Sequence, residues 1–303
     1  MIATNREQSG KPATASTKRR SVFLATAALL WADRRARIGI IMLGAFLAVY
    51  LFAPWIAPYS PTQGVSISMH GPTFRNWLGT TQSGQDVLSQ LIWGSRVSLS
   101  VAFLVGIIST ILALTVGLIQ GTVGGITDQV LGFVSNVFLV LPGLPLIIVV
   151  AAYAPARGLS VIVVIIAMTS WAWGSRIYRA QVISLNQRDY VTAARLSGDS
   201  NLRIMFHDIL PNMSSLVAAH FLGACMTGLL AESGLEFLGL GNPNVVSWGT
   251  MLYWAQNDNA LPLGQWAWIV APGLAIALFG MTLALINFGL DGISNPQLRE
   301  ANR

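Results

Sequence analysis

Few residues of this chain have side chains that could carry out chemistry. Its 303 residues include 12 acidic side chains, three histidines and one cysteine. A lone cysteine cannot form an intrachain disulfide or a cysteine metal cluster, and Cys225, which lies in an apolar run, is interpreted as a buried thiol. No HExxH pattern, GxSxG pattern or pair of carboxylates stands out. We therefore expect no catalytic residues and no metal site, which argues against an enzyme.

The distribution of lysine excludes the commonest kind of ATP site. The only lysines are Lys11 and Lys18. A P-loop needs a lysine that holds the phosphates, in the pattern GxxxxGK followed by Ser or Thr. Because no lysine follows position 18, the chain contains no such loop. We expect no cofactor in this chain, so any ATP must be hydrolysed by another one.

Composition predicts that helices spanning a lipid bilayer position these residues. Apolar residues make up 53% of the chain and charged residues only 10%, whereas soluble domains carry about 25% charged residues. Lipid is therefore the expected surroundings of the chain. Apolar segments long enough to cross a bilayer predict an all-α protein with six transmembrane helices, over residues 38–57, 97–119, 130–152, 159–177, 213–231 and 266–290.

The positions of the basic residues orient these spans. Eight lysines and arginines precede residue 38, five arginines lie within 174–212 and two follow residue 293. With six spans these segments share one side, and positive charge marks the cytoplasmic side. Both termini are thus expected in the cytoplasm. The predicted parts are a basic tail with an interfacial helix (1–37), a six-span domain (38–292) and a C-terminal tail (293–303).

The predicted spans contain almost no charge. A transporter driven by an ion gradient usually keeps carboxylates or histidines within the membrane, and this chain offers only His220 and Glu232 there. A stand-alone channel or secondary transporter is therefore the weaker alternative, and it predicts transport by this chain alone in liposomes. For Glu232 and Glu236 we favour a capping role at a span end, with contact to a substrate or a binding protein as the alternative.

The cytoplasmic loop 174–212 has the pattern of two short helices. Asp189 is expected to cap a first helix, and Gly198 to end it in a left-handed conformation. Ser200 or Asn201 begins the second helix, and Pro211 closes it. The apolar stripe expected along this helix consists of Leu202, Met205, Phe206 and Ile209. Such a stripe predicts a docking surface for another protein.

The same run resembles the EAA motif of permease subunits in bacterial ATP-binding-cassette (ABC) importers. The glutamate that gives the motif its name is Thr192 here. The matching residues are Ala193, Ala194, Gly198, Ile209, Leu210 and Pro211. The resemblance implies that the loop forms the coupling helices that dock onto an ATPase. The coupling residues expected on this basis are Asp189, Ala193, Ala194, Arg195, Gly198, Ile209, Leu210 and Pro211.

Three further blocks narrow the resemblance to the dipeptide, oligopeptide and nickel permease group. They are NWLGTTQSGQDVLSQLIWGSRVSL from Asn76, ESGLEFLGLGNPNVVSWGTML from Glu232, and the final span with its tail, which includes Pro272, Gly273 and residues 287–296. Together with the coupling loop they extend the resemblance over residues 35–300.

The resemblance implies the fold of type I ABC importer permeases in the bacterial inner membrane. The implied partners are a second homologous permease subunit, two ABC ATPase subunits that bind ATP and Mg²⁺, and an extracytoplasmic substrate-binding protein, with no nucleic acid. The chain would form half of a pathway for di- or oligopeptides. Oligosaccharides of the β-glucoside type and nickel stay open as alternative cargoes, and no substrate-binding residue is assigned.

Overall fold

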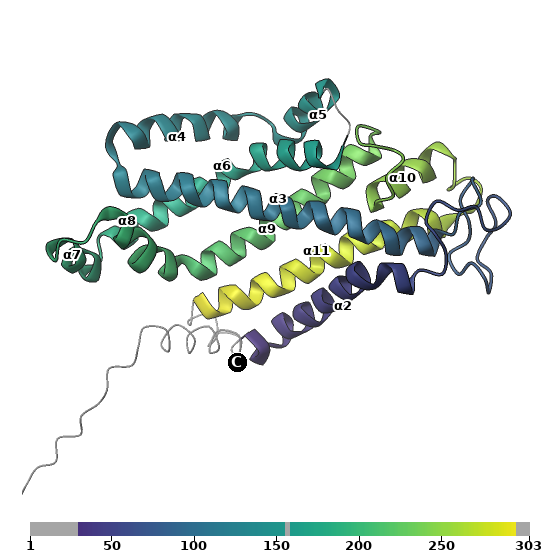
Figure 1. Ribbon diagram of the computed structural model, residues 1–303, viewed down its shortest axis with the longest axis horizontal. Helices are drawn as coiled ribbons and strands as arrows, with labels where there is room; N and C mark the ends of the chain where they lie inside the picture. The colour runs from purple at the N-terminus through teal and green to yellow at the C-terminus, as the bar shows by residue number, and fades with distance from the viewer. Residues whose placement is uncertain (1–29, 155–157, 295–303) are drawn as a thin grey trace, which may run out of the picture.

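The computed structural model describes residues 30–154 and 158–294, with side chains as far as residue 290. The interfacial helix expected over 21–31 and the tail 293–303 lie almost wholly outside this part of the chain. Within it, the regular structure is helical apart from two isolated β-bridges. The elements, labelled in Figure 1, are α2 (Arg34–Ile56), α3 (Val87–Val123), α4 (Gly125–Val140), α5 (Gly143–Tyr153), α6 (Leu159–Asn186), α7 (Asp189–Leu196), α8 (Asn201–Ile204), a π-helix η1 (Met205–Ile209), a 3-10 helix η2 (Leu210–Met213), α9 (Ser214–Phe237), α10 (Trp248–Asn257) and α11 (Trp266–Ser294).

The all-α membrane fold expected from the sequence is confirmed, but the third span is not one helix. In the described residues, five helical stretches are long and apolar enough to cross a bilayer, and α4 with α5 makes a sixth if this pair, bent by 88°, is counted as one span. The bend falls at Leu141 and Pro142. Proline has no N–H to continue the helix, and its ring forces the preceding residue into the extended region, where Leu141 lies at ψ 131°.

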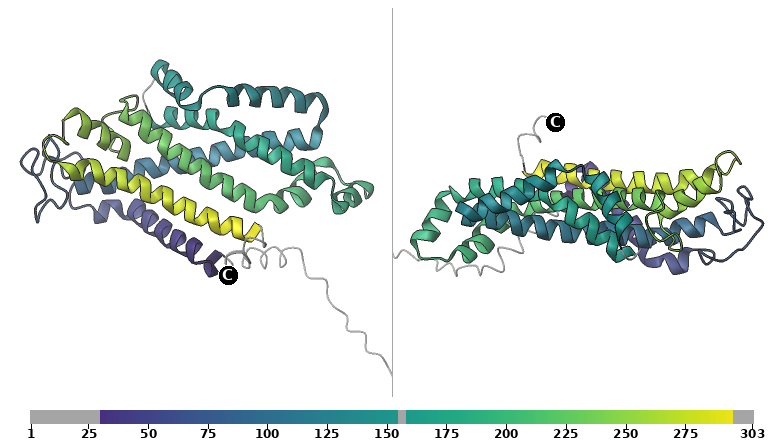
Figure 2. Two further views of the ribbon diagram at one scale, coloured as in Figure 1. Left: turned by 180° about the vertical axis from the view of Figure 1, so that it is seen from behind. Right: turned by 90° about the horizontal axis from the view of Figure 1, so that it is seen from above.

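Helix α3 lies at the centre of the bundle, along α6 and α9, while α2 and α11 pack side by side (Figures 1 and 2). Gly117 and Gly121 allow α3 to approach α6 closely. A Cβ atom added to Gly117 would lie 2.8 Å from the Ser175 carbonyl oxygen, and one added to Gly121 would lie 2.6 Å from the Cβ of Val182. The two helices therefore pack closely at these two glycines.

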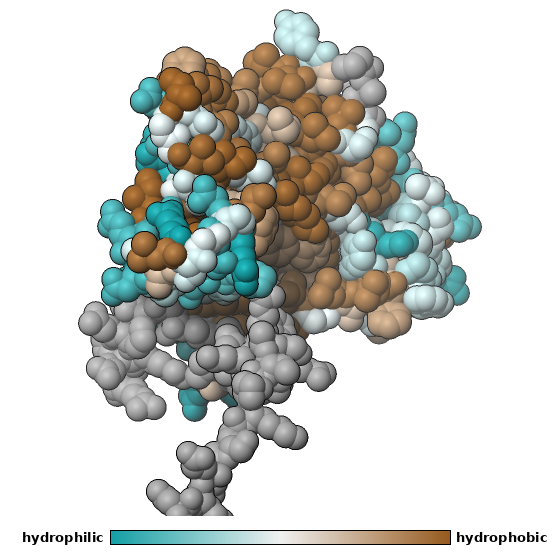
Figure 3. Space-filling view, turned by 60° about the vertical axis from the view of Figure 1, so that its left-hand side comes forward, coloured by the Kyte–Doolittle hydropathy of each residue, from teal (hydrophilic) through white to brown (hydrophobic). Residues whose placement is uncertain are grey.

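The bundle has two distinct ends (Figures 1 and 2). The start of α2, the end of α11 and the helices α7 and α8 lie toward one end, and the irregular segment 57–86 lies at the other with segment 238–265, which contains α10. Between the ends, hydrophobic side chains cover much of the outer surface (Figure 3). Large exposed apolar residues such as Val130, Phe133 and Val137 lie on the outside of α4. A surface of this kind suits lipid or another apolar helix bundle.

Candidate functional site

Helix α7 opens the loop between α6 and α9, and it begins one residue earlier than the sequence suggests. The N-cap is Arg188, with extended backbone (φ −78°, ψ 144°) and no side-chain cap, and Asp189 is the first helical residue. The expected capping role of Asp189 is therefore wrong. The chain leaves α6 at Gln187 in a helical conformation, so Arg188 must be the extended residue. Asp189 still places its carboxylate in the first turn, where the helix dipole favours negative charge.

Gly198 ends α7 in the left-handed conformation that the sequence predicts. Its φ is +86°. The N–H of Asp199 donates to the carbonyl of Ala194 at 3.1 Å, and the N–H of Gly198 donates to that of Arg195 at 3.0 Å. This pair of bonds is a Schellman motif, which satisfies carbonyls that the helix end would leave open. A Cβ added to Gly198 would meet no atom within 4 Å, so only its backbone conformation demands glycine.

The second helix begins as expected and does not end where expected. Ser200 is the N-cap of α8, and its hydroxyl accepts from the Arg203 N–H at 3.4 Å. Pro211 does not close the helix, since the helical path runs on without a break into α9. Proline cannot donate to the carbonyl four residues earlier, and the chain adjusts by changing pitch. Leu210 donates five residues back to Met205, and Ser214 donates three residues back to Pro211.

The apolar stripe predicted for this helix divides into two faces. Ile209 is fully buried, as are Val191 on α7 and Ile204 on α8. These three side chains join a core cluster that includes Leu118 of α3 and Tyr178 of α6. The inner face of the loop is therefore anchored in the transmembrane bundle. The expectation that Ile209 shares one face with Leu202 and Phe206 is wrong, because the π turn Met205–Ile209 is wider than an α-turn and places Ile209 on the inner face.

The outer face of the loop presents four large hydrophobic side chains to the outside. Tyr190 is 43% exposed, Leu196 85%, Leu202 67% and Phe206 52%. We call these four residues the coupling surface, after the role that the sequence resemblance implies for this loop. Large apolar side chains gathered on a short loop mark an interaction site more often than a solvated surface. Neither Tyr190 nor Leu196 was predicted from the sequence. For Leu196 a signal was present, because it is an apolar residue directly before the Ser-Gly pair that ends the helix.

The residues expected to couple are arranged around this surface. The guanidinium of Arg195 donates to the Asn186 side-chain oxygen at 3.0 Å, and the Asn186 amide donates to the Gly121 carbonyl at 2.7 Å, so α7 is tied to α6 and α3. Ala194 and Leu210 are half-buried, and Ile209 is buried. The exposed members of the expected set are Asp189, Ala193, Arg195, Gly198 and Pro211.

An ion pair that the sequence analysis did not anticipate braces the same end of the bundle. Arg179 of α6 donates twice to the carboxylate of Asp128 near the start of α4, at 2.6 Å and 2.5 Å. Bidentate pairs of this kind fix orientation as well as contributing energy. Arg179 counted only as one of the loop's positive charges, because 51 residues separate it from its partner.

At the other end, two glutamates that were expected to cap a span form a buried pair of carboxylates. Glu232 and Glu236 lie one turn apart on α9, and both are buried. Glu232 accepts from Ser98 of α3 at 3.3 Å, and Glu236 accepts from the hydroxyl of Ser247, the N-cap of α10. Instead of capping α9, as expected, they tie it to its neighbours.

The cysteine Cys225 was expected to be buried, and it is fully buried.

The sequence of this chain matches two protein-family models and is similar to the sequences of known transport proteins. Residues 113–300 match the family model described as "Binding-protein-dependent transport system inner membrane component", and residues 29–72 match the "N-terminal TM domain of oligopeptide transport permease C". The di/tripeptide transport system permease protein DppC of Pseudomonas aeruginosa is 34% identical over 83% of this chain and 84% of its own length. The oligopeptide transport system permease protein OppC of Mycobacterium tuberculosis is 31% identical over 89% and 94%.

Proposed function

The chain belongs to the family of binding-protein-dependent transport system inner membrane components, and from this premise we propose that it is one of two permease subunits of an ATP-driven importer of short peptides. It is a multi-pass membrane protein and an ABC importer permease, similar over most of its length to peptide permeases. In the proposed complex it supplies half of the translocation pathway. It carries out no covalent chemistry, because ATP and Mg²⁺ are bound by the partner ATPases.

The two-faced loop between α6 and α9 is the observation that carries this proposal. Its outer face, the coupling surface, fits into an apolar groove of an ATPase subunit. Its inner face is anchored in the bundle by Val191, Ile204 and Ile209. When ATP draws the ATPases together, the loop moves with them, and the attached spans change between inward and outward openings. This is rigid-body coupling between two distant sites.

The same arrangement supports a cytoplasmic location for both ends of the described bundle. The start of α2, the end of α11 and the coupling surface lie toward one end (Figure 1), and within the described ranges most of the arginines belong to the segments at that end. In the proposed orientation, segments 57–86 and 238–265 face the binding protein outside the cell. The relatives are peptide permeases, which favours peptides as cargo over oligosaccharides or nickel.

Site-specific cross-linking tests the coupling proposal. Cys225 is the only cysteine and is buried, so a thiol introduced elsewhere is the only accessible one. A Leu196→Cys variant should form a disulfide with cysteines placed along the groove of the ATPase, and closure by ATP should change the yield. Phe74→Cys, fully exposed at the opposite end, is the matched control and should not react. Equal cross-linking of both variants, or of neither, would contradict the proposed docking.

Reconstitution tests the transport proposal and its rival together. Proteoliposomes that contain both permeases and both ATPases should take up a labelled tripeptide only with ATP and the loaded binding protein. A secondary transporter or channel would give uptake by this chain alone, driven by an ion or substrate gradient. Uptake that needs neither ATP nor the binding protein would refute the importer assignment.

A further inference from the structure

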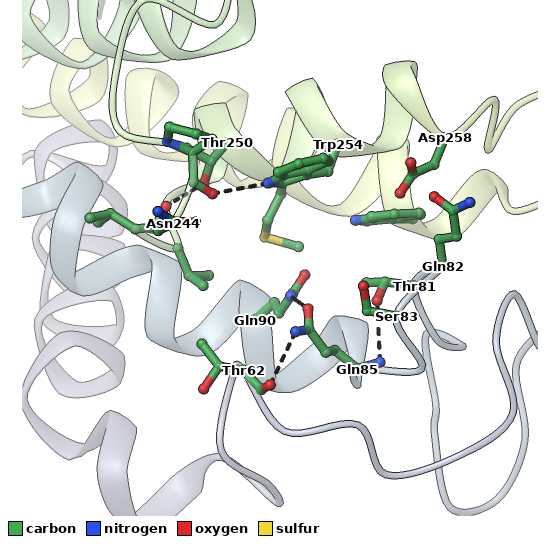
Figure 4. A pocket seen from close by; sticks show the side chains of 15 residues that line it. Thr62, Thr81, Gln82, Ser83, Gln85, Gln90, Asn244, Thr250, Trp254 and Asp258 are labelled. Carbon is green, nitrogen blue, oxygen red and sulfur yellow. Dashed lines mark hydrogen bonds between the residues drawn. The ribbon is translucent and has the colours of Figure 1, made fainter. Parts of the chain in front are cut away.

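A polar cavity lies at the end of the molecule opposite the coupling surface. Its volume is about 230 Å³, and it is enclosed by segment 57–86, the start of α3, the turn before α10, and α10 itself (Figure 4). Residues with side-chain amides or hydroxyls make up about half of its lining, beside apolar residues such as Met251 and Trp254. The amide and hydroxyl residues include Thr62, Gln82, Gln85, Gln90, Asn244 and Thr250.

Hydrogen bonds hold several of these amides in place. Gln90 donates to the side-chain oxygen of Gln85 at 2.7 Å, and Gln85 donates to the carbonyl of Thr62 at 3.1 Å (Figure 4). Fixed amide groups offer both donors and acceptors, as a peptide backbone does. A wall of this kind can bind peptide groups without selecting among side chains.

Asp258 is the only acidic residue that lines this cavity. The Gln82 amide lies against its carboxylate (Figure 4). Among the residues that the structure describes, no basic side chain forms an ion pair with it. Partial burial raises the pKa of the Asp258 carboxyl above its ordinary value. Because the carboxylate lines the cavity and has no basic partner among the described residues, an ammonium group is the ligand that complements its charge.

A second cavity adjoins the first and is lined by a basic residue instead of an acidic one. Its volume is about 400 Å³, and Thr62, Asn244 and Val246 line both cavities. The guanidinium of Arg96 lines the second cavity and lies 5.3 Å from the centre of the Trp93 ring. Within the described ranges, no carboxylate forms an ion pair with Arg96. A guanidinium held against an aromatic face is suited to bind a planar carboxylate.

We propose that the two adjoining cavities form a receiving site for a zwitterionic short peptide, with its amino terminus at Asp258 and its terminal carboxylate at Arg96. The proposal rests on the proposed function, because only a peptide cargo supplies both end charges. An uncharged oligosaccharide would satisfy neither Asp258 nor Arg96. The amides between the two charges bind the backbone of the peptide and leave its side chains free to vary.

The first cavity is connected to the helix bundle through Thr250. Thr250 lines the first cavity and exchanges hydrogen bonds with Ser247, at 2.8 Å and 3.1 Å. Ser247 in turn donates to Glu236 of α9. A peptide in the cavity thus rests on the residues that hold α10 against α9, the helix that leads to the coupling loop.

Photolabelling of the assembled transporter tests the site without the binding protein. The probe is a tripeptide with a central benzoyl-phenylalanine, made with free ends, with an acetylated amino terminus or with an amidated carboxyl terminus. Mass spectrometry locates the label, and a titration gives the half-saturating concentration. In the wild-type complex we expect label within residues 243–268. Blocking either end should raise the half-saturating concentration about tenfold or more, as expected for loss of a charge-assisted hydrogen bond.

The variants Asp258→Asn and Arg96→Gln assign the ends. Asp258→Asn should weaken labelling by the free probe about tenfold and have no effect on labelling by the acetylated probe. Arg96→Gln should likewise weaken labelling by the free probe and have no effect on labelling by the amidated probe. The exposed neighbour Gln256→Ala, which lies outside both cavities, is the matched control. If blocked ends and charge removal weaken labelling independently of each other, the assignment is wrong.

The experiments distinguish a wrong assignment of the peptide site from a wrong assignment of the function. A complex that imports the free tripeptide but takes no label at the cavities would refute the site and leave the function standing. A wild-type complex that imports no peptide would refute the proposed function. If a variant does not assemble, the comparison of free and blocked probes on the wild-type complex still decides whether the two end charges are recognised.

Discussion

Replacing Gly198 with valine should uncouple the transporter while leaving the membrane bundle intact. The residue has a φ of +86°, and an added Cβ meets no atom within 4 Å. The substitution therefore adds strain without a clash. A left-handed conformation costs an ordinary L-residue roughly 1–2 kcal/mol, and we take about 2 kcal/mol for a β-branched one. That energy shifts the balance between the formed and the opened turn about 30-fold, since 1.4 kcal/mol is a factor of ten.

The strain should stay local, because the Schellman turn is exposed and the buried anchors Val191 and Ile204 are unchanged. We expect Gly198→Val to insert and assemble normally, with an unfolding temperature close to that of the wild type, and to lose most ATP-driven peptide uptake in proteoliposomes. Gly198→Asn is the matched control, since asparagine tolerates the left-handed region, and it should retain most of the uptake. Equal uptake by both variants would refute the reasoning, as would loss of assembly in the valine variant alone.

Three further results are expected. Leu202→Asp should abolish ATP-dependent uptake without lowering the unfolding temperature, because the side chain is 67% exposed, and a lowered unfolding temperature would contradict its place on the coupling surface. A double-mutant cycle of Asp128→Ala and Arg179→Ala, measured by unfolding in detergent, should give a coupling energy of about 1 kcal/mol, and additive effects would mean that the pair contributes nothing. Gly117→Leu should destabilise the bundle by roughly 1–3 kcal/mol through overpacking, whereas Gly223→Leu, where an added Cβ meets nothing within 4 Å, should leave the unfolding temperature nearly unchanged.

Local sequence rules predicted the parts of the site that depend only on neighbouring residues. The left-handed turn at Gly198 and the cap at Ser200 follow from the conformational preferences of those residues, and both are present. The predictions at two prolines were wrong in opposite directions. A helix was expected to run through Pro142, where the chain bends, and another was expected to end at Pro211, where it continues. Whether proline breaks a helix depends on whether nearby turns can change pitch, and a sequence window does not contain that information.

Contacts between residues that are far apart in the sequence could not be predicted from it. Periodicity placed Ile209 beside Leu202, but a π turn lies between them, and Ile209 joins a core cluster with residues of α3 and α6. The pairing of Arg179 with Asp128 depends on how closely α4 lies against α6. Likewise, Glu232 and Glu236 are one turn apart in any helical interpretation. Their burial became visible only once Ser98 and Ser247 lay beside them.

The unbroken helical path from α8 to α9 determines what kind of motion the chain can deliver. It runs through 37 residues, from Asn201 to Phe237, and is about 55 Å long at 1.5 Å per residue. Its π and 3-10 turns, between residues 205 and 213, are the only irregular turns along it. Such turns have poorer hydrogen-bond geometry and bend more readily than an α-helix. In the proposed importer, the angle between the cytoplasmic loop and α9 therefore changes at these turns, while the α-helical part of α9 stays rigid.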